Sequence, residues 1–138
     1  MSELERFFPE HDNDYPQALR EIKEGKKESH WIWYIFPQLR GLGETARSWK
    51  FGIKDADEAR SYLSHPVLGF HLQEITEALL KLDETDPVKV MGKVDAMKLR
   101  SCMTLFAAIS DKGSVFHKVL DKFFGGEEDS VTLSMLKR

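Results

Sequence analysis

Apolar side chains recur at helical spacing along most of this chain. The most regular run places Leu68, Leu72, Ile75, Leu79 and Leu82 three or four residues apart, which predicts the buried face of a helix. Shorter runs of the same kind predict four more helices, over residues 12–25, 55–64, 95–109 and 114–124. The segment after residue 126 is acidic at first and then favours at most a short helix.

Residues that cap or stop helices stand at the ends of these runs. Asp12–Asp14 offers N-caps for the first helix, Pro16 suits its first turn, and Gly25 is a natural stop. Asp55 begins a capping-box pattern, and Asp95 is expected to be the cap of the helix that it precedes. The ends of the helices are therefore predicted as well as their faces.

One segment departs from helical spacing. Trp31–Phe36 is an unbroken run of aromatic and β-branched residues that ends at Pro37, which is typical either of a strand or of a buried helical turn. Gly41–Gly43 predicts a loop. Together the patterns predict a mainly α fold, a single domain over residues 1–138 arranged as an irregular bundle of five to seven helices with little or no sheet.

Composition and charge narrow the class of protein. An apolar fraction of 41% and a charged fraction of 31% are those of a folded domain and argue against disorder. A net charge of -3 gives no overall attraction to nucleic acid or to anionic membranes, and no apolar run is long enough to span a bilayer. We therefore expect neither nucleic acid nor membrane as a partner.

The cysteine content and the N-terminal residues favour the cytoplasm. Cys102 is the only cysteine, so it has no partner for an internal disulfide, and its apolar neighbours on a predicted helix indicate a packed rather than a nucleophilic thiol. The opening residues, Met1–Glu5, lack the basic and then apolar layout of a signal peptide. Oligomeric state is left open by the sequence.

Polar and aromatic residues that are costly to bury gather first around the double-tryptophan segment. Lysines near a glycine-containing loop are suited to hold an anion, tryptophan to stack on a flat ring, and histidine to move a proton near neutral pH. The alternative is that the tryptophans belong to the core and the lysines to a solvated face. The candidate ligand-binding residues here are Lys26, Lys27, Ser29, Trp31, Trp33 and Gln38, and the candidate acid or base is His30.

A second group lies on the predicted helix that contains Cys102. Lys98, Ser101 and Thr104 follow one another at three-residue spacing and so share a face. A lysine one turn before a serine can stabilise a serine alkoxide, which makes Lys98 and Ser101 candidate catalytic residues and Thr104 a candidate ligand contact. In the alternative, the two hydroxyls bond to helix carbonyls and the lysine extends to water.

His65 precedes a predicted helix and is a third candidate for contact with a ligand. The alternative role for His65 is to cap or space the turn before Pro66. The five histidines are scattered and the lone cysteine has no partner at zinc spacing, so we expect no metal site, and no motif indicates a cofactor.

Four segments in this order resemble the domain of unknown function 1810 family, whose members are often labelled calpastatin. They are Ser29–Gln38, Gly41–Gly43, Tyr62–Gly69 and Lys98–Phe106, and the resemblance extends from about Leu4 to Leu136. It implies a compact, mainly helical cytosolic domain and no established activity. Where the family tends to have two serines this chain has Ser101 followed by Cys102.

Two functional hypotheses follow. In the first, the domain binds an anionic small molecule such as a nucleotide-derived metabolite, and acts on it with His30 as the first acid or base. Ser29–Gln38 and Lys98–Thr104 would then meet and form one pocket, although about sixty residues separate them. In the second, the domain is a protein–protein interaction module without chemistry, and the same side chains surround an exposed apolar patch.

Overall fold

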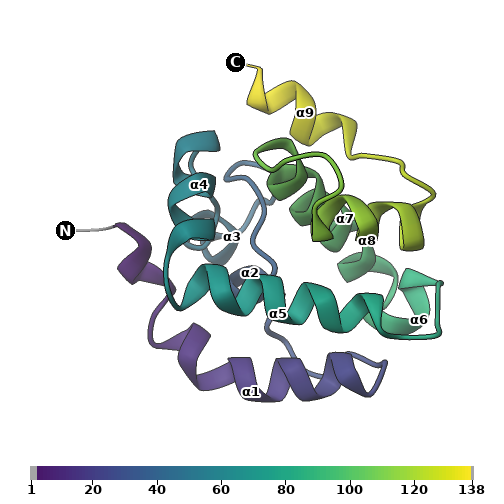
Figure 1. Cartoon of the computed structure of the whole chain (residues 1–138). Helices are drawn as coiled ribbons and strands as arrows, with labels where there is room; N and C mark the ends of the chain where they lie inside the picture. Colours follow the sequence, from purple (N-terminus) through teal and green to yellow (C-terminus); the bar gives the residue numbers. More distant parts are fainter. Residues whose placement is uncertain (1–2, 138) are drawn as a thin grey trace.

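Helices dominate residues 3–137, the part of the chain that the computed structural model describes, and no strand occurs there (Figure 1). A short 3-10 helix, η1, spans Glu3–Phe7. The α-helices are α1 (Glu10–Lys23), α2 (Ile32–Ile35), α3 (Ala46–Lys50), α4 (Ala56–Ser64), α5 (Leu68–Leu80), α6 (Pro87–Met91), α7 (Lys93–Ala108), α8 (Val115–Phe124) and α9 (Ser130–Leu136).

The mainly α fold is confirmed, but the expected five to seven helices are too few. Nine α-helices lie in the described residues, and the additional ones are short. The helices α2, α3 and α6 have only four or five residues each. A helix of little more than one turn does not repeat an apolar position, so its sequence has no visible period.

The core lies where α5 and α7 meet the surrounding helices. α7 packs against α4, α6, α8 and α9, and α5 packs against α1, α4 and α8 (Figure 1). Leu72 on α5 and Phe106 on α7 are fully buried. Cys102 is also buried, and burial raises the pKa of its thiol well above the usual range, as expected for a packed cysteine. No helix of residues 3–137 is long and apolar enough to cross a membrane.

The expected start of the first helix is wrong. α1 begins at Glu10, directly after Pro9, so Asp12–Asp14 lies inside the helix and Pro16 lies beyond its first turn. Asp14 accepts a hydrogen bond from the Tyr34 hydroxyl instead of capping the helix. The error arises because the local sequence does not distinguish an aspartate that caps a helix from one that bonds to a distant residue.

Asp95 is not the cap of its helix either. α7 begins at Lys93, directly after Gly92, whose φ of 87° turns the chain between α6 and α7. Asp95 therefore lies in the first turn of α7, and its carboxylate faces Lys27 and Lys98. The predicted cap at Asp55 is present, with its side chain accepting a hydrogen bond from the backbone of Glu58.

The double-tryptophan segment forms a helical turn, α2, and not a strand. After it the chain is held by a single parallel bridge between Leu39 and Ile53. The Ile53 amide donates to the Gln38 carbonyl at 2.8 Å, and the Arg40 amide donates to the Ile53 carbonyl at 2.8 Å. These two bonds fix the backbone of Gln38, which has a place in the site described next.

Candidate functional site

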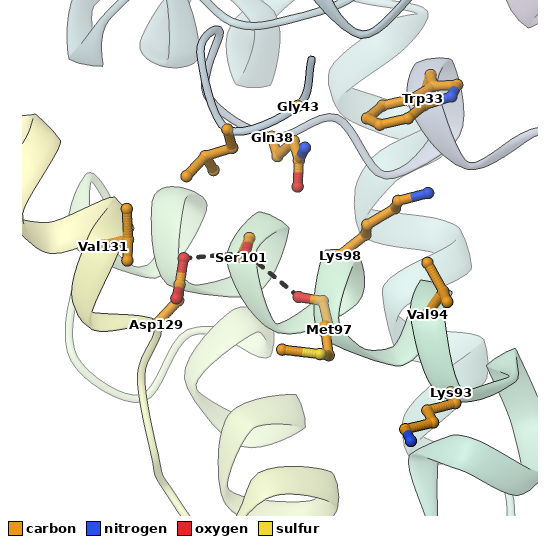
Figure 2. Close-up of a pocket in the computed structure, with 11 residues that line it drawn as sticks. Trp33, Gln38, Gly43, Lys93, Val94, Met97, Lys98, Ser101, Asp129 and Val131 are labelled. Atoms are coloured by element: carbon orange, nitrogen blue, oxygen red, sulfur yellow. Dashed lines mark hydrogen bonds between the residues drawn. The ribbon is translucent and has the colours of Figure 1, made fainter. Parts of the chain in front are cut away.

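A pocket of about 590 Å³ opens between the first half of α7, the loop after α2 and the start of α9 (Figure 2). Its apolar lining consists of Trp33, Leu42, Val94, Met97 and Val131. Its polar lining consists of Gln38, Lys93, Lys98, Ser101 and Asp129. The two segments that were expected to converge, Ser29–Gln38 and Lys98–Thr104, therefore both contribute to one pocket.

A second, smaller pocket of about 320 Å³ adjoins the first. It is lined by Ile32 and Trp33 and by the charged or titratable residues Lys27, His30, Arg47, Asp95 and Lys98. Trp33 and Lys98 belong to both pockets. The ammonium group of Lys98 lies 4.3 Å from the centre of a Trp33 ring, so a cation–π contact stands at the junction of the two pockets.

The smaller pocket, which we call the cationic pocket, has more positive than negative charge. Asp95 pairs with Lys27 at 2.8 Å and with Lys98 at 3.2 Å. Arg47 adds a third cation, and no second carboxylate lines this pocket among the described residues. The side chain of Lys27 is only 6% exposed, so its charge is poorly screened by solvent. An incoming anion would find unbalanced positive charge here.

The far end of the larger pocket is formed by a tightly held carboxylate. Asp129 is the N-cap of α9, and its Oδ2 accepts hydrogen bonds from the Ser101 hydroxyl at 3.0 Å and from the Thr132 amide at 3.2 Å. Burial by itself would raise the pKa of the Asp129 carboxyl, but the bonds from Thr132 and Ser101 outweigh it and the pKa is lowered. Asp129 is therefore ionised at neutral pH.

Gln38 contributes a side-chain amide to this pocket, and the amide has no hydrogen-bond partner among residues 3–137. The residue is 7% exposed, and its side chain points toward α7 in Figure 2. Its side-chain amide makes no hydrogen bond to any residue from 3 to 137, although the backbone carbonyl is bonded to Ile53. The amide is open to the pocket and has no partner in the described part of the chain to give up, so it is available to a ligand.

The loop next to Gln38 approaches Trp33 closely because residue 43 is glycine. A Cβ at Gly43 would lie 2.6 Å from the Cβ of Ser48 and 3.2 Å from Cη2 of Trp33. Any other residue would clash with Ser48 and push the loop away from α3, and it would also crowd Trp33. The predicted loop at Gly41–Gly43 is thus part of the pocket wall.

The other predicted ligand-binding residues line neither pocket. Trp31 is 1% exposed and its indole N–H donates to Glu21 at 3.0 Å, so it belongs to the core and cannot stack on a ligand. Ser29 likewise donates to Glu21 at 2.6 Å. Lys26 is exposed and away from both pockets. Nδ1 of His65 accepts from the amides of Val67 and Leu68, which is the expected alternative of a spacer at the turn.

The hydroxyls of Thr104 and Ser101 bond to carbonyls of their own helix, as the alternative expected. The single hydroxyl proton of Ser101 is shared between the Met97 carbonyl at 3.2 Å and Asp129 at 3.0 Å, and Thr104 donates to the carbonyl of Arg100 at 2.8 Å. Thr104 also accepts from the Asp129 amide at 2.9 Å, so it positions α9 and does not reach the pocket. Lys98 does not extend into water, as the alternative expected. Its side chain lies against Asp95 and Trp33 and is only 24% exposed.

The three candidate catalytic residues lie in different parts of the two pockets. His30 is exposed at the cationic pocket, and Lys98 stands at the junction. Ser101 lies in the larger pocket, where its hydroxyl hydrogen bonds to Asp129. No described contact joins Lys98 to Ser101, so the alkoxide role of Ser101 remains a prediction.

Asp129 and Arg47 belong to the two pockets but carry no signal in the sequence. Asp129 is remote in the chain from the double-tryptophan segment, and Arg47 lies on α3, the next helix after it. Acidic and basic residues are common on helix surfaces, so neither residue stands out in the sequence. Among residues 3–137, no cluster of three or more histidine, cysteine, aspartate or glutamate side chains is placed to hold a metal ion.

Glu21 is a further residue that sequence reasoning missed. Its carboxylate accepts from the amides of Glu28 and Ser29 as well as from Trp31, and so orders the chain that leads into the site. Burial would raise the pKa of this carboxyl, but these bonds together with those from Ser29 and Gln17 side chains lower it to about 2.

Comparison with known proteins gives a family and a fold. Residues 1–136 match the family described as "Protein of unknown function (DUF1810)". The conserved hypothetical protein Rv1873 from Mycobacterium tuberculosis has a crystal structure that superposes with a TM-score of 0.94 at 37% sequence identity, over 98% of this chain and 96% of that one. No curated protein matches the chain significantly.

Proposed function

Since the chain belongs to the DUF1810 family, whose description names no activity, we propose a function from its pockets. The protein binds an anionic small molecule with a flat ring, as a nucleotide-derived metabolite is. One observation carries the proposal: Trp33 and Lys98 line both an apolar pocket and a cationic one.

The larger pocket suits the ring of such a ligand. Its wall combines Trp33 with apolar side chains, as the walls of ligand pockets usually do. Stacking of a base on an aromatic side chain contributes about 1–3 kcal/mol. The volume of about 590 Å³ lies within the usual range for small-molecule sites.

The cationic pocket suits the anionic group. Lys27, Arg47 and Lys98 offer three positive charges against the single carboxylate of Asp95. A phosphate there would accept hydrogen bonds from the lysines and the guanidinium, which are stronger than bonds between neutral groups. A ligand that places its ring in one pocket and its phosphate in the other would pass the Trp33–Lys98 contact.

Any reaction on the ligand is assigned first to His30. Its imidazole lines the cationic pocket and is exposed, so it is within reach of a bound phosphoester or its neighbours. Localisation in the cytoplasm fits such a metabolite-binding role and the reduced state of the lone thiol of Cys102. The net charge of -3 gives no reason to expect nucleic acid as the ligand.

Isothermal titration calorimetry with AMP, GMP, CMP and UMP, and with the matching nucleosides, tests the proposal. At least one nucleotide is expected to bind more tightly than its nucleoside, because only the nucleotide carries the phosphate. Lys98→Met, which removes the charge and keeps the apolar stem, should weaken that binding about tenfold or more. Lys112→Met, at an exposed turn outside both pockets, is the matched control.

Equal affinity of nucleotide and nucleoside, or equal behaviour of the two lysine variants, would contradict the proposal. Failure of all four nucleotides to bind would overturn it and favour the second candidate, a protein–protein interaction module. That candidate has its own observation: Val94, Met97 and Val131 line the larger pocket and are 65%, 60% and 53% exposed. Such an apolar surface also suits a protein partner.

A further inference from the structure

The polar end of the larger pocket holds two hydrogen-bonding groups with unused capacity. Both Ser101 and Thr132 bond to Oδ2 of Asp129, while Oδ1 accepts no hydrogen bond from any residue between 3 and 137. The side-chain amide of Gln38, on the opposite wall, is also without a partner in that part of the chain. Both residues border the same cavity, and Figure 2 shows the Gln38 side chain directed toward the helix that carries Ser101.

The Asp129 carboxylate and the Gln38 amide determine which hydrogen-bond donors and acceptors a ligand needs at this end of the pocket. Asp129 is ionised, so it accepts only, and it needs N–H or O–H donors. Gln38 offers both a carbonyl oxygen and an NH2 group. A ligand group that pairs with this amide would replace the water that solvates it in the open pocket.

From this arrangement we infer that the pocket recognises a ring with a 2-amino-4-oxopyrimidine edge, which guanine and pterins share. That edge presents two adjacent donors, a ring N–H and an exocyclic NH2, and both would donate to Oδ1 of Asp129, since Oδ2 already accepts from Ser101 and Thr132. Its carbonyl oxygen, beside the ring N–H, would accept from the Gln38 amide. The inference rests on the proposed function and names the class of ring.

Other bases fit this end of the pocket less well. In adenine the exocyclic NH2 stands next to a ring nitrogen whose lone pair would face the Asp129 carboxylate. Hypoxanthine keeps the ring N–H and the carbonyl oxygen but lacks the second donor. Because a site that hydrogen bonds to a ligand donor discriminates against ligands that lack it, GMP is expected to bind best, IMP next and AMP weakest.

Binding of GMP, IMP, AMP and pterin-6-carboxylate, measured by calorimetry, tests this order. GMP should bind about tenfold or more tightly than IMP, because the two differ only in the 2-amino group. A pterin-6-carboxylate that binds as tightly as GMP would identify the shared edge and not the nucleotide as the main determinant. Equal affinity of GMP, IMP and AMP would overturn the inference.

Asp129→Asn is the informative variant, with Asp83→Asn at an exposed position as its control. Asparagine is as good an N-cap as aspartate, so α9 should remain formed, although the melting temperature should fall somewhat because Ser101 and Thr132 then bond to a neutral acceptor. The preference for GMP over IMP should nevertheless fall to about twofold or less, because the charged acceptor is gone. An unchanged preference in this variant would show that Asp129 does not contact the ring.

Gln38→Leu separates recognition from stability. The Gln38 amide makes no hydrogen bond within residues 3–137 and the residue is only 7% exposed, so an apolar side chain of similar size should leave the melting temperature unchanged or raise it. Affinity for GMP should fall about tenfold or more, so binding and stability move in opposite directions. A variant that binds GMP normally would overturn the inference even if the nucleotide phosphate is bound as proposed.

The two proposals fail differently. If the nucleotides bind, respond to Lys98→Met and ignore the base, the anionic site stands and the ring recognition is wrong. If neither nucleotide nor pterin binds, both are wrong.

Discussion

A single carboxylate, that of Glu21, orders the segment that leads to the pockets. Its oxygens accept from two backbone amides, from the Ser29 hydroxyl, from the Trp31 indole and from Gln17. Trp31 is thereby kept in the core, while Trp33, two residues later, is left for the pocket wall. The bond to Glu21 on α1 therefore holds Trp31 in the core, and Trp33 is the tryptophan that lines the pocket.

Glu21→Gln should lower the free energy of unfolding by about 1–3 kcal/mol at pH 7, because hydrogen bonds to a charged acceptor are lost. The folded pKa of Glu21, about 2, lies below its ordinary value of 4.5, so its ionised form stabilises the fold fully above pH 4.5. That contribution is lost as the pH falls toward 2. The difference between the wild type and the variant should therefore narrow between pH 6 and pH 3 in denaturant melts.

The control for this measurement is Glu44→Gln, at an exposed position. Its unfolding energy should follow that of the wild type at each pH. A gap for Glu21→Gln that stays constant down to pH 3 would mean that the carboxylate is not the acceptor described.

At the scale of elements, α1 and α5 are joined by a stacked array of rings. His11 Nε2 and His71 Nδ1 lie 2.9 Å apart, and the rings of Tyr15 and His71 are stacked with centroids 3.7 Å apart. The Tyr15 hydroxyl donates to Glu74 at 2.6 Å. Burial lowers the pKa of His11, and His71 beside it lowers that pKa further, against the bond to the Tyr34 carbonyl that raises it. Burial also lowers the pKa of His71, against Glu74 and Asp12.

Because both histidines have folded pKa values below the ordinary value of 6.5, the unfolded chain binds more protons than the folded one in mild acid. Stability should therefore fall as the pH is lowered from 7.5 to 5. In His11→Gln, whose side chain can still bond to both neighbours and does not titrate, the fall should be smaller. Urea melts at pH 7.5 and pH 5 measure the loss of unfolding free energy in each protein. An equal loss in the wild type and in His11→Gln would contradict the account.

How far the sequence predicts the structure also differs between elements. The long helices α5, α7 and α8 are evident from their apolar period, and the Asp55 cap from its spacing. The short helices α2, α3 and α6 are not, because they are fixed by tertiary contacts and not by local propensity. Asp14 and Asp95 were expected as caps, yet each serves a partner from another helix or loop.

At the scale of the whole molecule, the site is made by convergence. The sequence indicates Gln38, Lys98 and Ser101 because each is costly to bury without a role, and Trp33 because its ring can stack; the fold brings these four to one pocket. His30, the other polar candidate, lines only the cationic pocket. Asp129 and Arg47 complete the two pockets and were missed. Their positions depend on how α9 and α3 pack, which no local pattern encodes.

The placement of the three tryptophans offers the most direct test of this site. Trp33 lines both pockets, Trp31 is buried against Glu21, and Trp49 is exposed with Arg40 over its ring, outside both pockets. A titration of the 15N-labelled protein with GMP reports on each indole N–H separately. The account predicts that the Trp33 indole resonance shifts saturably with GMP while those of Trp31 and Trp49 stay in place. A saturable shift at Trp49 alone, or no shift at Trp33 at full occupancy, would contradict it.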